Sequence, residues 1–87
     1  MAKFKVVLIR KAQKNLDKIR GKSYYFIYSA LKDLSSEPFP AGFKQLVNLG
    51  YGEYRIRVGD YRIIYNVDTR KKLVCILKVG HRKDIYK

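Results

Sequence analysis

The residues best suited to chemistry are three arginines, Arg55, Arg57 and Arg62, in a stretch where apolar and polar side chains alternate. This period-two alternation is typical of strands with one buried face. Between the two alternating runs lies Gly59-Asp60, which favours a two-residue hairpin loop. Across such a loop Arg57 faces Arg62, and Arg55 lies on the same face. Guanidinium groups gathered in this way suit an anion, because their planar fork matches phosphate oxygens.

A solvated face is the alternative interpretation of the arginines. Like charges placed opposite each other on a sheet destabilise it by about 0.2–1 kcal/mol, so a fold that keeps them usually has an anion for them. In water, however, long side chains splay apart and their repulsion is weak. Charge alone therefore leaves both interpretations open.

The hairpin register follows from the loop. With two loop residues, the expected cross-strand partners besides Arg57 and Arg62 are Val58 with Tyr61, Ile56 with Ile63, Arg55 with Ile64, and Tyr54 with Tyr65. The face opposite the arginines is then continuously apolar and must pack against other elements of the chain.

Composition sets limits on the partner. The chain has 87 residues, which suits one domain over residues 1–87, and its 20 Lys and Arg against 7 Asp and Glu give a net charge of +13. This charge predicts attraction to a polyanion, such as nucleic acid, an anionic membrane or an acidic protein. A membrane role is the weakest of these, because the longest apolar run near the start is Val6-Val7-Leu8-Ile9.

Cysteine and histidine usage argues against a metal or disulfide framework. Cys75 is the only cysteine, which excludes an intrachain disulfide and suggests a reducing, cytoplasmic location. Cys75 and His81 together do not make a zinc site, and the sequence has no glycine-rich phosphate loop. We therefore expect no metal and no cofactor.

The order of elements predicts an α+β domain. Phe4–Ile9 is expected to be a strand, Arg10–Arg20 a helix that stops at Gly21, and a second helix is expected to start with Ser23 as its N-cap. Proline ends that helix before residue 40. The Gly52–Val67 hairpin and an inner strand at Leu73–Val79 follow, whereas residues 41–51 could form either a short strand or a packed loop.

These elements predict an antiparallel β-sheet of about four strands with an N-terminal helical hairpin packed on one face, in the order β-α-α-β-β-β. The helices should cover the apolar face of the Gly52–Val67 hairpin. The arginine face would then stay open, with the C-terminal tail at its edge.

Two segments together resemble a known family. Tyr54-Arg-Ile-Arg-Val-Gly-Asp-Tyr-Arg-Ile-Ile-Tyr65, followed by Val79-Gly-His-Arg-Lys-Asp-Ile-Tyr86, is similar to the RelE/ParE superfamily of bacterial and archaeal toxins. The similarity is greatest to its RelE-type branch and extends over essentially the whole chain. The resemblance implies a toxin of a toxin–antitoxin system, and in the RelE-type branch a ribosome-dependent mRNA endoribonuclease that cuts in the A site and inhibits translation. The alternative within the superfamily is a ParE-like inhibitor of DNA gyrase without nuclease activity.

The resemblance also implies which residues carry the activity. Arg62 matches the strand arginine of the RelE-type branch, Arg82 the arginine after the final strand, and Tyr86 the near-terminal tyrosine. Arg55 and Arg57 fall where well-known members have lysines, and His81 falls where other branches also have histidine. The catalytic residues expected on this basis are His81, Arg62, Arg82, Tyr86, Arg57 and Arg55, and the further RNA contacts are Lys44, Lys78 and Lys83.

Such RNA cleavage needs no metal: the 2′-OH attacks the adjacent phosphorus and the 5′-oxygen leaves. Arg62 and Arg82 are expected to stabilise the phosphate, with Arg55 or Arg57 assisting. Arginine is a poor base because it keeps its proton, whereas the ordinary pKa of histidine, about 6.5, suits proton transfer.

His81 is therefore the expected general acid/base, with its pKa lowered by the neighbouring arginines. The alternative is an exposed histidine in the tail without a role. Glu53 is a second candidate base, although we favour a surface ion pair with Arg55 for it. Tyr86 would stack on the target base, orient the phosphate or anchor the tail.

The resemblance also implies an antitoxin partner. An acidic, RelB-like and partly disordered antitoxin suits a chain of this charge, and it could fold on binding in a groove beside the helical hairpin. It would block the site, displace the Tyr86 tail or neutralise the arginines. The other expected partners are the ribosome and mRNA, and the toxin–antitoxin complex could bind operator DNA. A plain basic nucleic-acid-binding module is the remaining alternative, which predicts salt-dependent duplex binding without toxicity.

Overall fold

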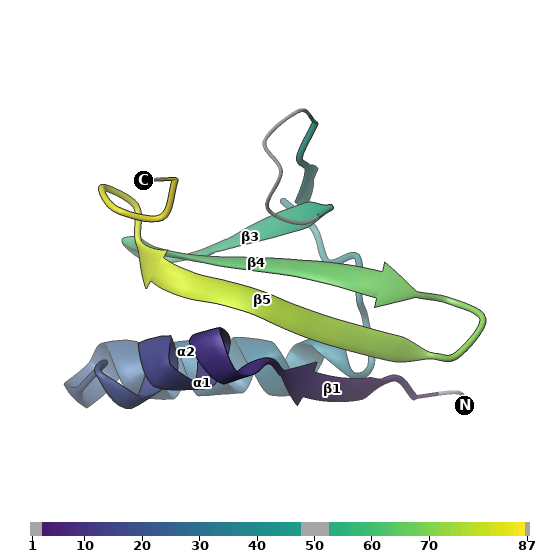
Figure 1. Cartoon of the computed structure of the whole chain (residues 1–87), viewed down its shortest axis with the longest axis horizontal. Coiled ribbons are helices and arrows are strands. Elements are labelled where there is room, and N and C mark those ends of the chain that lie inside the picture. The colour runs from purple at the N-terminus through teal and green to yellow at the C-terminus, as the bar shows by residue number, and fades with distance from the viewer. Residues whose placement is uncertain (1–2, 48–52, 87) are drawn as a thin grey trace.

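The protein folds into a five-stranded sheet with two helices on one face (Figure 1). The computed structural model describes residues 3–47 and 53–86. In chain order the elements are β1 (Lys5–Leu8), α1 (Arg10–Asp17), α2 (Gly21–Leu34), β2 (Lys44–Gln45), β3 (Tyr54–Val58), β4 (Tyr61–Asp68) and β5 (Leu73–His81). The strands are arranged in the order β1-β5-β4-β3-β2. This α+β architecture confirms the expected fold class.

The core lies between the helices and one face of the sheet. It combines one side of each helix with alternate residues of β3, β4 and β5, as amphipathic elements require. Its buried members are Ala12, Leu16, Ile19, Ile27, Leu31, Leu34, Ile56, Ile63, Tyr65, Val74, Ile76 and Val79. Tyr65 is tied in further by its hydroxyl, which donates a 2.7 Å hydrogen bond to the carbonyl oxygen of Pro38.

The hairpin of β3 and β4 has the predicted register. Each expected pair is formed, including Arg57 opposite Arg62 and Tyr54 opposite Tyr65. Gly59 opens the loop with φ of 60°, a value that glycine adopts without steric cost. The helices pack against the apolar face, as predicted, so the arginines are on the other face. Gly52, the first residue of the predicted hairpin, lies outside the described residues.

The sheet is mixed rather than wholly antiparallel. β1 pairs in parallel with β5, placing β5 between β1 and β4 as an inner strand. The connection from β1 to β5 contains both helices, and a crossover of this kind is what a parallel pair requires. Part of residues 41–51 forms β2, which pairs with Arg55 and Tyr54 of β3. Residues 48–51 lie outside the described residues.

The connection between the two helices lies earlier in the chain than predicted, because α1 ends at Asp17 and not at Arg20. Gly21 is the first residue of α2 and has φ of 69°, so the chain reverses at this glycine. The predicted N-cap at Ser23 is wrong, because α2 begins two residues earlier and its N-cap is Arg20, without a side-chain cap. Gly21 still marks the boundary between the helices, but it begins α2 instead of stopping α1.

A β-bulge between β4 and β5 changes the direction of the last residues of β5. The register shifts between Ile64 and Tyr65, so that Ile64 pairs with Lys78 but Tyr65 pairs with Ile76. One extra residue on a strand reverses the faces of every residue after it. Gly80 consequently pairs with Arg62 on the arginine face, and His81 pairs with Tyr61 on the helix face.

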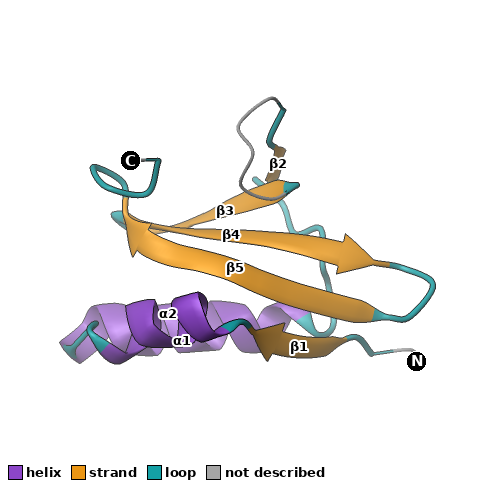
Figure 2. Cartoon of the chain, in the orientation of Figure 1, coloured by secondary structure: helices purple, strands orange, loops and turns teal. Residues whose placement is uncertain are grey.

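The C-terminal turn folds over the face opposite the helices (Figure 2). Ile85 is fully buried, and a Cβ placed on Gly80 would lie 3.2 Å from Cδ1 of Ile85. Ile64 is also fully buried on this face. The tail thus packs on the arginine face itself, whereas we predicted it at the edge.

Candidate active site

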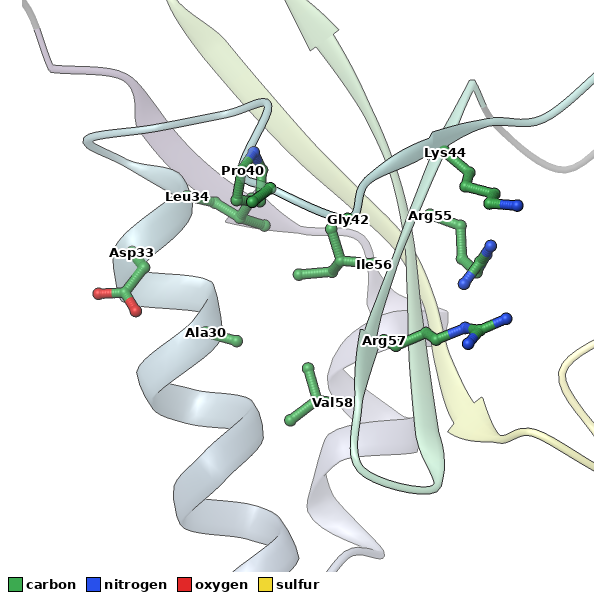
Figure 3. A pocket seen from close by; sticks show the side chains of 11 residues that line it. Ala30, Asp33, Leu34, Pro40, Gly42, Lys44, Arg55, Ile56, Arg57 and Val58 are labelled. Carbon is green, nitrogen blue, oxygen red and sulfur yellow. The ribbon is translucent and has the colours of Figure 1, made fainter.

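Arg55, Arg57 and Arg62 form the base of the site. Arg57 and Arg62 are direct cross-strand partners, and Arg55 is two residues before Arg57 on the same face of β3. Figure 3 shows Arg55 and Arg57 pointing away from α2, together with Lys44, whereas Ile56 points toward the helix. The period-two alternation of the sequence therefore separates the cations from the core.

Arg62 is held by the hairpin loop. Its Nη1 donates hydrogen bonds to the carbonyl oxygens of Gly59, at 3.0 Å, and of Tyr61, at 2.9 Å. These two bonds hold one nitrogen of the guanidinium against the loop. A cation fixed in this way is preorganised for an anion on the open side of the sheet.

The pKa of Arg62 depends on the charged groups around it. Burial lowers the pKa of Arg62, and the positive charges of Arg57, Arg55 and Arg82 lower it further, whereas Tyr86 raises it. Three further arginines and a tyrosine therefore lie close enough to act on Arg62. Their mutual repulsion would be relieved by a bound polyanion.

Arg55 is the most constrained member of this cluster. Only 6% of the residue is exposed, and its Nη1 is buried without a hydrogen-bond partner. A buried donor without an acceptor costs about 1–3 kcal/mol, and more when it is charged. With Lys44 and Arg57 it lines a groove of about 490 Å³ between α2 and the outer edge of β3, where Asp33 of α2 is also part of the lining (Figure 3).

The C-terminal turn brings Arg82 to the hairpin loop. The backbone N–H of Arg82 donates a 2.7 Å hydrogen bond to the carbonyl oxygen of Asp60, and Nε of Arg82 is 3.7 Å from Oδ1 of Asp60. Both side chains are largely exposed, so this ion pair adds little stability by itself. Together with the burial of Ile85, these contacts place Arg82 and Tyr86 beside the strand arginines.

His81 is the predicted site residue that the structure does not bring to the arginines. Its ring contacts Tyr61 edge-to-face on the helix side of the sheet, with ring centroids 5.6 Å apart. It lines a cavity of about 550 Å³ beside α1, with Lys11, Asn15 and Lys18. Its proposed proton transfer stays a prediction, but the bulge turns the imidazole away from the arginine face.

Glu53 does not line the groove of Arg55 and Arg57. It lines a separate cavity of about 530 Å³ with Asn66, Asp68 and Cys75, at the other end of the sheet. The surface ion pair that we expected between Glu53 and Arg55 does not form. The role of Glu53 as a second candidate base stays a prediction.

The three lysines predicted to contact RNA lie in different places. Lys44 is opposite Arg55 in the strand pairing and shares its groove. Lys83 is exposed in the C-terminal turn. Lys78 lines the cavity beside α1, and burial followed by the charge of Lys11 lowers its pKa.

Sequence reasoning missed the residues that hold the site in place. Asp60 anchors Arg82, and Gly80 leaves room for Ile85 to pack on the sheet. Asn15 was also missed: its Oδ1 accepts a 3.1 Å hydrogen bond from the N–H of Val79, beyond the end of β1. Gly80, directly after the predicted strand, was the available signal, because a glycine in or beside a strand often marks a bulge or a close approach.

Two further properties hold for residues 3–47 and 53–86. No three His, Cys, Asp or Glu side chains in these ranges come together as metal ligands. In the same ranges no helix has the length and apolar character needed to span a membrane.

Comparison with known proteins identifies the family of this fold and site. Residues 6–86 match the family described as ParE toxin of type II toxin–antitoxin system, parDE. The chain therefore belongs to the RelE/ParE superfamily of toxins from toxin–antitoxin systems.

Individual relatives agree with this assignment. The chain is 43% identical to Toxin RelG of Mycobacterium tuberculosis over 58 residues, which is 67% of this chain and 66% of RelG. The toxin–antitoxin complex RelBE2 of M. tuberculosis contains a similar chain, with a TM-score of 0.80, 30% identity, and coverage of 92% of this chain and 99% of that one. The archaeal RelE–RelB complex of Pyrococcus horikoshii gives the same TM-score and identity, with coverage of 97% and 99%.

Proposed function

We propose that this toxin is a metal-independent endoribonuclease that cuts mRNA in the ribosomal A site and so inhibits translation in the cytoplasm. The observation that carries the proposal is the arginine cluster, above all the buried Arg55 whose Nη1 has no partner. A fold that keeps such a group unpaired gains most when an anion enters the site. The resemblance of the sequence to the RelE-type branch favours RNA as that anion.

The cluster supplies charge stabilisation for the cleavage. As the 2′-OH attacks, negative charge builds up on the non-bridging phosphate oxygens. Arg62 is fixed by the hairpin loop and Arg82 by Asp60. Their positive guanidinium groups would stabilise that negative charge from two sides. Preorganised groups of this kind are usually the largest single contribution to catalysis. Arg55 and Arg57 would hold the flanking phosphates, with Lys44 extending the path.

Tyr86 would complete the site by stacking on the target base or orienting the phosphate. Its influence on Arg62 supports a position beside the reacting group. Proton transfer by His81 would require the imidazole to reach the arginine face from the helix face. Stacking and charge stabilisation are therefore the contributions to which the described side chains are best suited.

Two arginine variants test this assignment. We expect Arg62→Gln and Arg82→Gln to lower the rate of mRNA cleavage by about 10²–10³-fold each, because each removes a preorganised charge. The matched control is Arg70→Gln, which removes one charge from the turn between β4 and β5, at the far end of the sheet. Cleavage is measured in a translating extract, and unfolding in urea confirms that each variant is folded. Full cleavage by both site variants would contradict the proposal.

A DNA gyrase target is the other outcome that such an experiment distinguishes. If expression of the wild-type chain causes DNA damage before translation stops, and the extract contains no cut mRNA, the ParE-like alternative replaces the nuclease. The order of the two effects is measured by pulse-labelling protein synthesis alongside a DNA-damage reporter.

An acidic, RelB-like antitoxin is the partner that we propose for the toxin. The net charge of +13 favours it, and the toxin–antitoxin complexes among the similar structures support it. Because the site is itself a cluster of arginines, an acidic segment could neutralise it directly. Binding of the resulting complex to operator DNA is part of the same proposal.

A further inference from the structure

We propose that His81 is a positioning residue, whose imidazole Nδ1 holds the C-terminal turn so that Arg82 and Tyr86 face the phosphate. This inference rests on the proposed nuclease function. It assigns His81 a role on the helix face, where the structure places it, in place of proton transfer on the arginine face.

Three successive backbone N–H groups converge on His81. Nδ1 of its ring accepts a 3.2 Å hydrogen bond from the N–H of Lys83. Its carbonyl oxygen accepts hydrogen bonds from the N–H groups of Asp84, at 2.8 Å, and Ile85, at 3.0 Å. A side chain that accepts from the backbone two residues later is the pattern of an Asx turn, here made by imidazole.

The hydrogen bond from Lys83 fixes the tautomer of His81. In the neutral ring, Nδ1 is the acceptor and Nε2 carries the proton. Nε2 can act as a base only when the single proton of the neutral ring is on Nδ1. A protonated Nδ1 could no longer accept the hydrogen bond from the N–H of Lys83. His81 thus cannot keep the turn and act as a neutral base through Nε2 at the same time.

The turn that His81 holds carries the distal half of the site. Arg82 bonds to Asp60 at the start of the turn, Ile85 is buried against Gly80 near its end, and Tyr86 follows. The contact with Tyr61 holds the ring from the other side. Loss of the Nδ1 acceptor would free the first bend of the turn and shift Arg82 and Tyr86 together.

Asparagine and glutamine variants separate positioning from proton transfer. Oδ1 of asparagine can take the place of Nδ1 and accept from the N–H of Lys83, whereas the amide of glutamine lies near the position of Nε2. We expect His81→Asn to cleave mRNA within about 3-fold of wild type, and His81→Gln and His81→Ala to lose about 10–100-fold, since a misplacement of about 1 Å costs up to 10²-fold.

Two results would overturn the proposal. Equal losses of about 10²–10⁴-fold in His81→Asn and His81→Gln would identify His81 as a general acid or base. Full activity in all three variants would leave His81 without a role. Urea unfolding of each variant separates these results from loss of the folded state.

A spectroscopic measurement tests the same inference without activity. A long-range ¹H–¹⁵N spectrum of the wild-type chain should show the Nε2–H tautomer of His81, and the amide of Lys83 should be protected from hydrogen exchange. His81→Asn should keep that protection and His81→Gln should lose it. The Nδ1–H tautomer, or an unprotected Lys83 amide in the wild type, would overturn the proposal. Absence of mRNA cleavage by a wild type that shows the Nε2–H tautomer would instead count against the nuclease function.

Discussion

At the scale of single residues, the most informative side chain is Arg55. It is buried, charged and without a partner for Nη1, so it lowers stability, which is consistent with the binding role that we propose for it. Natural proteins retain such residues where function requires them. Arg57, two residues later on the same face, is exposed and provides an internal comparison.

We expect Arg55→Met to raise the free energy of unfolding by about 1 kcal/mol or more, because it removes a buried donor without an acceptor and keeps the aliphatic volume. The same variant should lose RNA cleavage. The control Arg57→Met should change the free energy of unfolding by less than about 0.5 kcal/mol. Urea denaturation measures both, and destabilisation of the Arg55 variant would show that its guanidinium is satisfied in the folded state.

At the scale of elements, the hairpin of β3 and β4 could be predicted from sequence. A two-residue loop and strict alternation leave one register, and that register forms. The parallel pairing of β1 with β5 could not be predicted, because nothing local to Lys5–Leu8 specifies a partner so far along the chain.

The location of His81 could not be predicted for a different reason. Continued alternation from Ile76 would place His81 on the arginine face, beside the arginines that we expected to be its neighbours. The bulge opposite Ile64 and Tyr65 adds one residue to β5 and turns His81 to the helix face. The positions of Arg62 and Arg57 depend only on the register of the hairpin, which the loop determines. Their predicted pairing is therefore confirmed.

The hydrogen bond from Tyr65 of β4 to Pro38, in the segment after α2, makes the stability of the fold depend on pH. Burial raises the pKa of Tyr65 to about 12, with smaller contributions from Tyr54 and Glu37. The unfolded chain loses this proton near pH 10 and the folded chain keeps it to about pH 12, so the stabilisation is complete below pH 10 and falls as pH rises between these values.

The stabilisation lost between pH 10 and 12 should be roughly 2–3 kcal/mol. Tyr65→Phe should remove this part of the pH dependence, and it should also cost about 1–3 kcal/mol at neutral pH by leaving the carbonyl of Pro38 without its donor. Tyr25→Phe, at an exposed position on α2, is the control. Urea unfolding at several pH values measures the difference, and identical pH slopes for Tyr65→Phe and wild type would contradict the prediction.

At the scale of the whole molecule, we expect the net charge of +13 to govern the proposed association with RNA. Each phosphate that is neutralised on a single strand contributes about −0.7 to the slope of log affinity against log salt concentration. We expect Arg62→Gln to reduce this slope by about 0.7, whereas Arg70→Gln, far from the site, should leave it unchanged. Fluorescence anisotropy of a short single-stranded RNA gives both slopes. Equal slopes for wild type and Arg62→Gln would indicate that the arginine face does not bind the strand.

The most direct test of the nuclease is primer extension on a defined mRNA in a reconstituted translation system, with ribosomes present or omitted. We predict cuts within A-site codons that require ribosomes, need no added divalent ion beyond that of the ribosome, and disappear with Arg62→Gln. The fragments should carry a cyclic phosphate and a 5′-hydroxyl, because the 2′-OH is the nucleophile. An uncut mRNA, or cuts that persist with Arg62→Gln, would contradict the account.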